Sequence, residues 1–291
     1  MSQMDGETLV EPVQLADFQR VEFTGRPLFM QTEKGAAKMK PVFAQSSWPI
    51  CYQVTSEMIQ IHSDRPLRVL TSAIMGGEEQ AATLILNRHV QKSYCPPDPE
   101  AEVKEWLNGK RISTKGTVVL LTAAYVDQAD FRVQASDGFR IAVWATAGVG
   151  NAARAGVEGM DDSPGKPGTI NLVLVIDGEL TQAAMVNSII TATEAKSAAL
   201  QDLAVTDSAG NIATGTTTDA IVVAATQQRV GSVLHRYAGV ASPLGQVIGR
   251  LVYRAVREAV LNEKRIKQKG IVNNGSRLDY FCSLSVRPSY R

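Results

Sequence analysis

The sequence carries almost no net charge, because 30 lysine and arginine residues balance 29 aspartate and glutamate residues and leave +1 at pH 7. Such a balance provides no overall attraction to nucleic acid or to an acidic membrane surface. No stretch reaches about eighteen uninterrupted apolar residues, the length of a membrane-spanning helix. The first residues also lack the basic segment and apolar run that mark a secretory signal. We therefore expect a cytoplasmic protein that binds neither nucleic acid nor membrane.

Cysteine and histidine are scarce, which excludes several kinds of metal and redox site. The three cysteines lie far apart and outside any Cys-x-x-Cys spacing, so neither a disulfide framework nor a zinc ribbon is indicated. The chain also lacks His-Glu-x-x-His, Gly-x-Ser-x-Gly and Walker motifs. The sequence therefore predicts no metal held by the protein itself.

The composition is that of an ordinary globular chain, with 44% hydrophobic and 20% charged residues. Short apolar runs alternate with hairpin signals and helical segments, which predicts a single α/β domain of mixed α+β type, with a mixed β-sheet flanked by long helices. We expect strands within 50–62, 68–74, 82–86, 117–124, 131–133, 139–145, 168–176 and 220–224, and helices at 99–107, 180–203 and 243–262. This domain should occupy residues 49–262, with 1–48 as an extension packed on it and 263–291 as a basic tail.

Two of the expected helices begin with clear capping signals. Asp98 precedes Pro99, and Ser242 precedes Pro243, so each helix has a side-chain cap followed by proline at its first position. The middle helix carries Glu194 among small and apolar residues. We therefore expect Glu194 to be buried on most sides and to pair with a residue from elsewhere in the chain.

The densest polar cluster of the sequence lies directly before an apolar run. It contains Thr214, Gly215, Thr216, Thr217, Thr218 and Asp219, followed by Ala-Ile-Val-Val-Ala. Hydroxyl and carboxylate groups at the edge of a core need partners, since each unpaired group costs roughly 1–3 kcal/mol. Either the threonines cap their own backbone in a turn, or they bind a ligand.

Three further polar clusters occur at the ends of expected strands, where α/β sheets place their ligands. They are Thr71 and Ser72 with Gly76 and Gly77, Thr146 with Gly150 and Asn151, and Thr169 with Asn171. The Gly148-x-Gly150 spacing lacks the third glycine of a dinucleotide loop. Small residues instead permit close approach of a ligand to backbone N–H groups.

The three histidines, His62, His89 and His235, are scattered along the chain. Each is either structural or exposed, or serves as a base or as an axial ligand to a metal that a substrate carries.

Several of these segments, in this order, resemble the adenosylcobinamide amidohydrolase family. The resemblance runs from about Leu67 to Leu261. Its most specific parts are Thr193-Glu-Ala-Lys196 and Thr214-Gly-Thr-Thr-Thr-Asp219. The other matching segments are Thr122-Ala-Ala, Thr146-Ala-Gly-Val-Gly-Asn-Ala, Gly168-Thr-Ile-Asn and Ala184-Met-Val.

The resemblance implies an enzyme of corrinoid salvage that hydrolyses the aminopropanol amide of adenosylcobinamide and releases adenosylcobyric acid. Amide hydrolysis requires a base or nucleophile, donors for the oxyanion and an acid for the departing amine. Candidate catalytic residues are Asp219, Glu194, Thr216 and Lys196, with His235 as a second acid. Candidate substrate-binding residues are Thr71, Ser72, Gly76, Gly77, Thr146, Gly150, Asn151, Asn171, Thr214, Thr217, Thr218 and His235.

The implied partner is a small-molecule corrinoid, and a homo-oligomer is compatible with the sequence. No cofactor is expected, because the cobalt belongs to the substrate. Two alternatives remain open: a corrinoid-binding or carrier protein without catalysis, and a self-processing hydrolase whose nucleophile is a threonine of the 214–218 stretch.

Overall fold

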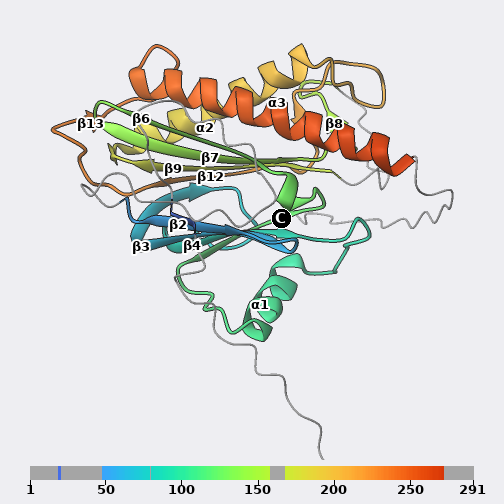
Figure 1. The fold of residues 1–291 in the computed structure, drawn as a ribbon, viewed down its shortest axis with the longest axis horizontal. Coiled ribbons are helices and arrows are strands. Elements are labelled where there is room, and N and C mark those ends of the chain that lie inside the picture. Colours follow the sequence, from blue (N-terminus) through green and yellow to red (C-terminus); the bar gives the residue numbers. More distant parts are fainter. Residues whose placement is uncertain (1–18, 21–47, 79, 158–167, 272–291) are drawn as a thin grey trace, which may run out of the picture.

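The computed structural model describes residues 19–20, 48–78, 80–157 and 168–271 (Figure 1). Its α-helices are α1 (Pro99–Gly109), α2 (Gln182–Asp202) and α3 (Pro243–Ile271). The longer strands are β2 (Ile50–Val54), β3 (Met58–Thr71), β4 (Ala81–His89), β5 (Thr117–Thr122), β6 (Asp130–Ser136), β7 (Phe139–Ala147), β9 (Ile170–Asp177) and β12 (Ala220–Ala225). The two-residue strands are β1 (Gln19–Arg20), β8 (Ala152–Ala153), β10 (Glu179–Leu180), β11 (Gly215–Thr216) and β13 (Leu234–His235), and a 3-10 turn, η2, covers Val126–Gln128.

Strand β3 joins two parts of one mixed sheet. The main path runs β1-β2-β3-β12-β9-β7-β6, while β4 pairs with both β3 and β5. Pairs β12–β9 and β4–β5 are parallel, and the other pairs of this sheet are antiparallel. The register of β3 on β4 shifts between His62 and Leu67. The first part of β3 therefore pairs with β2, and its last residues pair with β12.

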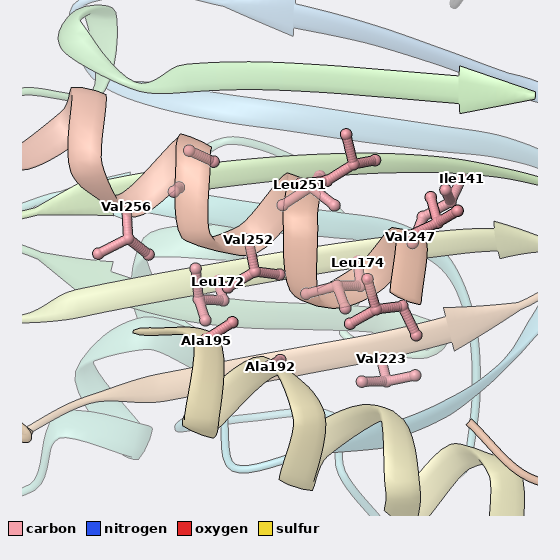
Figure 2. Close-up of a cluster of buried hydrophobic side chains, with 14 of the residues drawn as sticks. Ile141, Leu172, Leu174, Ala192, Ala195, Val223, Val247, Leu251, Val252 and Val256 are labelled. Carbon is pink, nitrogen blue, oxygen red and sulfur yellow. The ribbon is translucent and has the colours of Figure 1, made fainter. Parts of the chain in front are cut away.

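Three apolar clusters separate four layers. Alternate residues of a strand point to opposite faces, so Ile141 and Leu174 pack beneath α2 and α3 (Figure 2), whereas Trp144 and Val173 pack against residues of β2 to β5 such as Ile85. A smaller cluster lies between α1 and the outer face of β4 and β5. The order is thus α2 and α3, then β6, β7, β9 and β12, then β2 to β5, then α1, as Figure 1 shows. The expected mixed sheet with flanking helices is confirmed.

Helix α1 is fixed to β4 by a charged contact. Both guanidinium nitrogens Nη1 and Nη2 of Arg88 donate to Glu102, at 2.8 and 2.9 Å, and the hydroxyl of Tyr94 donates to the same carboxylate at 2.7 Å. The Arg88 hydrogen bonds lower the pKa of Glu102 below its ordinary value of 4.5, although burial opposes the shift. A carboxyl group with a lowered pKa stabilises the fold above its unfolded pKa, and this contribution disappears as pH falls through the folded pKa.

We therefore expect Glu102→Gln to lower the free energy of unfolding at pH 7 but not at strongly acidic pH. The difference from wild type should shrink as the pH falls through and below about 4.5. Urea unfolding at a series of pH values measures it. Glu105→Gln, on the same helix and exposed, is the control and should show no such convergence. A difference from wild type that stays constant down to pH 2 would contradict this role of Glu102.

Two predicted boundaries are wrong. The expected separate strand at 68–74 is the end of the longer β3, which stops at Thr71. Helix α3 continues to Ile271 instead of ending near 262, because residues 263–269 are mostly good helix formers without proline or glycine. The predicted caps are confirmed: Asp98 accepts from the backbone of Ala101, and Ser242 accepts from that of Gly245.

Most of the predicted 1–48 extension and the end of the 263–291 tail lie outside the described residues. Within the described part of the chain, no helix is long and apolar enough to cross a membrane.

Candidate active site

One end of the layered sheet collects most of the polar clusters. Here β4, β5 and β7 end, and β9 and β12 begin. The register places Thr146 of β7 opposite Asn171 of β9, and Asn171 opposite Ala220 of β12. The Thr-rich stretch immediately before β12 therefore lies beside the ends of the neighbouring strands.

Asp219 is the centre of the first group of side chains. Its Oδ1 accepts a hydrogen bond from the Thr216 hydroxyl and another, at 3.0 Å, from the backbone N–H of Ile170. Its Oδ2 contacts the Nζ of Lys196, which reaches it from α2. The side chains of Lys196 and Asp219 are only 11% and 17% exposed. An ion pair shielded to this degree from water holds a carboxylate in a fixed position beside a hydroxyl group.

Gly215 is required for this ion pair. A Cβ added at Gly215 would clash with Oδ2 of Asp219 and would lie 2.7 Å from Nζ of Lys196. Strand β11 also fixes the backbone at this position, since Gly215 and Thr216 pair with Ala153 and Ala152 of β8. The glycine in the Thr-Gly-Thr sequence therefore lets the lysine and the aspartate meet directly above the chain.

We expect Gly215→Ala to separate the ion pair and to reduce activity at least tenfold, because a displacement of about 1 Å in a catalytic site can cost 10²-fold. Steady-state kinetics on the folded variant measures this. Gly210→Ala is not a suitable control, because Gly210 has a φ of +86°. Gly239→Ala is suitable, since no atom lies near its added Cβ, and it should retain activity. If Gly215→Ala showed wild-type kinetics, the ion pair would have no role in the mechanism.

The turn after β7 forms the second group. Asn151 Nδ2 donates to the hydroxyl oxygens of Thr217, at 2.7 Å, and Thr218, at 3.4 Å. Its Oδ1 is buried with no partner within the described residues, and the backbone N–H groups of Gly150 and Asn151 likewise have no acceptor there. Two successive N–H groups of this kind are able to bind an anionic oxygen.

A buried polar network underlies these two groups. Asn87 Nδ2 donates to the Thr146 hydroxyl at 3.0 Å, and Asn171 Nδ2 donates to Asn87 Oδ1 and to the carbonyl of Leu121, both at 2.9 Å. Asn87, Thr146 and Asn171 are between 1% and 3% exposed. Thr169 extends the network by bonding to Asn171 Oδ1 and to the carbonyl of Thr218, at 3.1 and 2.7 Å. This network thereby links the core between the two packed parts of the sheet to the Thr-rich turn.

Asn171→Ala should destabilise the fold by about 2 kcal/mol, because it leaves the buried Asn87 oxygen and the Leu121 carbonyl without their donor. Urea unfolding measures the loss. Asn108→Ala on the exposed surface of α1 is the control and should lie within about 0.5 kcal/mol of wild type. Equal stability of the two variants would show that the hydrogen bonds of Asn171 do not stabilise the fold.

Several predicted residues lie next to this end of the sheet without joining either group. Thr71 donates to the carbonyl of Ile221, and Ser72 accepts from its N–H, so both lie against the start of β12. Gly77 packs near the Thr71 methyl group. Gly76, at a φ of +94°, instead lies tightly against Thr117 and Val118 at the beginning of β5, so it is not brought to the end of the sheet where β5 ends. Thr214 accepts a hydrogen bond from the backbone of Ala155, and its carbonyl accepts one from Ser197.

Two further predicted residues are not brought to the site. Glu194 is exposed, so the expectation that it is buried is wrong. The buried residues of α2 are mostly small, among them Ala184, Ala192, Ala195 and Ala199, while Val186 and Ile190 face outward and are 42% and 49% exposed.

His235 lies at the opposite end of the sheet. Its Nε2 bonds to the carbonyl of Gly138 in the β6–β7 turn at 2.9 Å, and its ring contacts Phe139. Figure 1 shows β13 and β8 at opposite ends of the molecule. His235 therefore has a structural position, away from Asp219.

Asn87 and Ser197 were not predicted, and Thr169 and His89, although noted as part of a polar cluster and as a possible base or axial ligand, were not among the candidate site residues. Asn87 and His89 end the strand expected at 82–86, so the same strand-end signal that identified Thr146 could have found them. Thr169 directly precedes β9. Ser197 carries no sequence signal, because only the packing of α2 brings it to Thr214.

The described residues include no cluster of three or more His, Cys, Asp or Glu side chains that could hold a metal ion. The chemistry that they offer is that of a carboxylate, an ammonium group, a hydroxyl and free backbone N–H donors. This set suits the attack of a hydroxyl on a carbonyl carbon with stabilisation of the oxyanion.

Comparisons with known proteins give the family of this chain. A profile of the adenosylcobinamide amidohydrolase family matches residues 46–268. The adenosylcobinamide amidohydrolase of Methanosarcina mazei is 30% identical over 173 residues, 60% of this chain and 76% of that protein. An uncharacterized protein of Methanocaldococcus jannaschii is 34% identical over 180 residues, 55% of this chain and 69% of its own length. A crystal structure of a Pyrococcus horikoshii protein aligns with 73% of this chain and 78% of its own, at 11% identity and a TM-score of 0.36. The chain therefore belongs to the adenosylcobinamide amidohydrolase family, a family of hydrolases.

Proposed function

We propose that this chain hydrolyses the amide that links aminopropanol to the corrin ring of adenosylcobinamide, releasing adenosylcobyric acid in cobalamin salvage in the cytoplasm. The observation that carries the proposal is the cluster of Asp219, Thr216 and Lys196, which lies wholly within the 46–268 family match. Beside it, the N–H groups of Gly150 and Asn151, which have no acceptor among the described residues, provide donors for an oxyanion.

Asp219 acts as the base in this proposal. It takes the proton of the attacking hydroxyl, which belongs to Thr216 or to a water molecule in contact with it, and the oxygen bonds to the amide carbon. The carbonyl oxygen becomes an oxyanion held by the N–H groups of Gly150 and Asn151. As the carbon–nitrogen bond breaks, Lys196 protonates the departing amine and then recovers a proton from Asp219. If Thr216 attacks, water hydrolyses the resulting ester in a second, similar step.

The protein contributes no metal of its own to this reaction, and the cobalt stays part of the substrate. The Thr, Asn, Gly and Ala side chains at this end of the sheet suit the amide-fringed edge of a corrin ring, because they combine hydrogen-bonding groups with little bulk.

The direct test is to incubate the purified full chain with adenosylcobinamide and to separate the products by chromatography. We expect adenosylcobyric acid and free aminopropanol in equal amounts. Tight binding without either product would instead identify a corrinoid carrier. An intact mass spectrum of the same preparation should show one uncut chain, whereas two fragments split near Thr214 to Thr216 would identify a self-processing hydrolase.

A further inference from the structure

His89 lies at the same end of the sheet as the candidate active site, and the proposed reaction does not use it. It is the last residue of β4, two positions beyond Asn87. Side chains two apart on a strand share a face, so His89 follows Asn87 on the inner face. Asn87 touches Asn171, and Ile170, one residue before Asn171, donates its N–H to Asp219. His89 therefore lies outward from the Asn87–Asn171 contact on the inner face, whereas Asp219 lies beside the start of β9 and reaches Lys196 of α2.

The segment after β5 connects these two sides. The carbonyl of Ala124 lies 2.9 Å from His89 Nδ1. A Cβ added at Gly148 would lie 3.7 Å from Ala124 Cβ and 3.3 Å from Gly168 Cα. Contacts between buried small residues thus connect the segment beside His89 to the turn that holds Asn151.

The imidazole ring of His89 has a fixed orientation and one free nitrogen. Because the Ala124 carbonyl only accepts, Nδ1 carries the proton and Nε2 keeps its lone pair. Tyr125, 52% exposed, stacks on the ring with centroids 5.5 Å apart and planes inclined by 24°. Within the described residues Nε2 has no hydrogen-bond partner, and His89 itself is only half-buried.

Histidines that bind metals show this arrangement: the other ring nitrogen donates to a backbone carbonyl or a carboxylate, which sets the tautomer and the ring orientation. In the described part of the chain no three His, Cys, Asp or Glu side chains gather to hold a metal. A metal ion that binds His89 must therefore take its other ligands from the molecule that carries it. A corrinoid without a lower base meets this condition, since four ring nitrogens hold its cobalt and one axial position is open.

We propose that Nε2 of His89 binds the open axial position of the cobalt in the substrate corrinoid, with Tyr125 supporting the imidazole. This inference rests on the proposed function, because it takes the substrate to be cobinamide. The lone pair of Nε2 forms the new bond, a water molecule leaves the cobalt, and neither atom changes oxidation state. The bond fixes the plane of the corrin ring relative to Asp219, so His89 is a substrate-binding residue rather than the base.

Electron paramagnetic resonance of cob(II)inamide bound to the full chain tests the proposal. We expect one nitrogen nucleus to split the cobalt lines into triplets, and labelling the protein with ¹⁵N-histidine should convert the triplets into doublets. The labelled wild-type protein makes this test independent of any variant. Bound cob(II)inamide without nitrogen splitting would overturn the proposal.

His89→Ala should abolish the splitting and weaken cob(II)inamide binding by about tenfold or more. The matched control is His62→Ala: His62 lies on β3 with its Nδ1 4.0 Å from Asp64 Oδ1, and the splitting should persist. Hydrolysis of adenosylcobinamide by a wild-type protein that shows no splitting would refute this inference alone. Splitting without hydrolysis would refute only the proposed activity, and absence of cobinamide binding would refute both.

Discussion

Asp219→Asn is expected to lower kcat for adenosylcobinamide hydrolysis by about 10²–10⁴-fold, the usual contribution of a positioned general base. The amide oxygen of asparagine still accepts from Thr216 and from the Ile170 N–H, so the turn keeps its shape. What is lost is the charge that takes up the proton and pairs with Lys196. Steady-state kinetics with circular dichroism as a check on folding measures the effect.

Glu194→Gln is the matched control, because it makes the same change of charge on the helix that carries Lys196. Glu194 is exposed, so we expect kinetics close to wild type. A folded Asp219→Asn protein with full activity, or an inactive Glu194→Gln protein, would show that the base has been placed on the wrong residue.

Thr216 separates the two routes of attack. If its hydroxyl is the nucleophile, Thr216→Ala should lose nearly all activity while Thr216→Ser keeps much of it. If water attacks, both variants should retain measurable turnover. A covalent adduct trapped by rapid acid quench and located by mass spectrometry would identify the ester directly.

Asp177→Ala is expected to have the largest effect on stability, a loss of about 3–5 kcal/mol, because Arg140, only 18% exposed, loses the carboxylate of this ion pair and Thr226 loses its acceptor. Asp177 is 3% exposed. Arg140 Nε donates to its Oδ2 at 2.7 Å, and the Thr226 hydroxyl donates to its Oδ1 at 2.9 Å. Chemical unfolding in urea measures the change.

A nearby surface pair provides the comparison. Glu179→Ala removes the carboxylate that pairs with Arg229, whose side chain is 55% exposed, and such exposed pairs contribute at most about 1 kcal/mol. The double variant Arg140→Met with Asp177→Leu should be milder than Asp177→Ala, since both charges of the pair are then removed together. Equal losses from Asp177→Ala and Glu179→Ala would mean that the Arg140–Asp177 pair is solvated.

The elements that sequence reasoning located are those with local signals. Asp137 and Gly138 form the tight turn between β6 and β7, and Gly138 adopts the φ of +86° that favours glycine. Asp98 and Ser242 cap their helices for equally local reasons. The arginine row of α3, Arg250, Arg254 and Arg257, is exposed, because the apolar stripe on the other side of the helix fixes which face is buried.

The contacts that assemble the site are not local. Lys196 and Asp219 are brought together by the packing of α2 on the sheet, and no local sequence pattern predicts that they pair. Glu194 was misplaced because apolar neighbours were taken as a sign of burial, whereas α2 buries its alanines against α3 and exposes Val186 and Ile190. The sequence around His235 does not show to which end of the sheet the chain returns after residue 226.

The position of β12 has a consequence for synthesis of the protein on the ribosome. This strand lies between β3 and β9. The ribosome nevertheless makes it late, because Ile221 of β12 follows its hydrogen-bond partner Thr71, the last residue of β3, by 150 residues. Until β12 emerges, the pairing edges of both neighbours stay open, and open edges of this kind favour aggregation. Chains released before residue 225 should therefore collect in the insoluble fraction, and completion of the sheet should wait for nearly the whole domain to leave the ribosome.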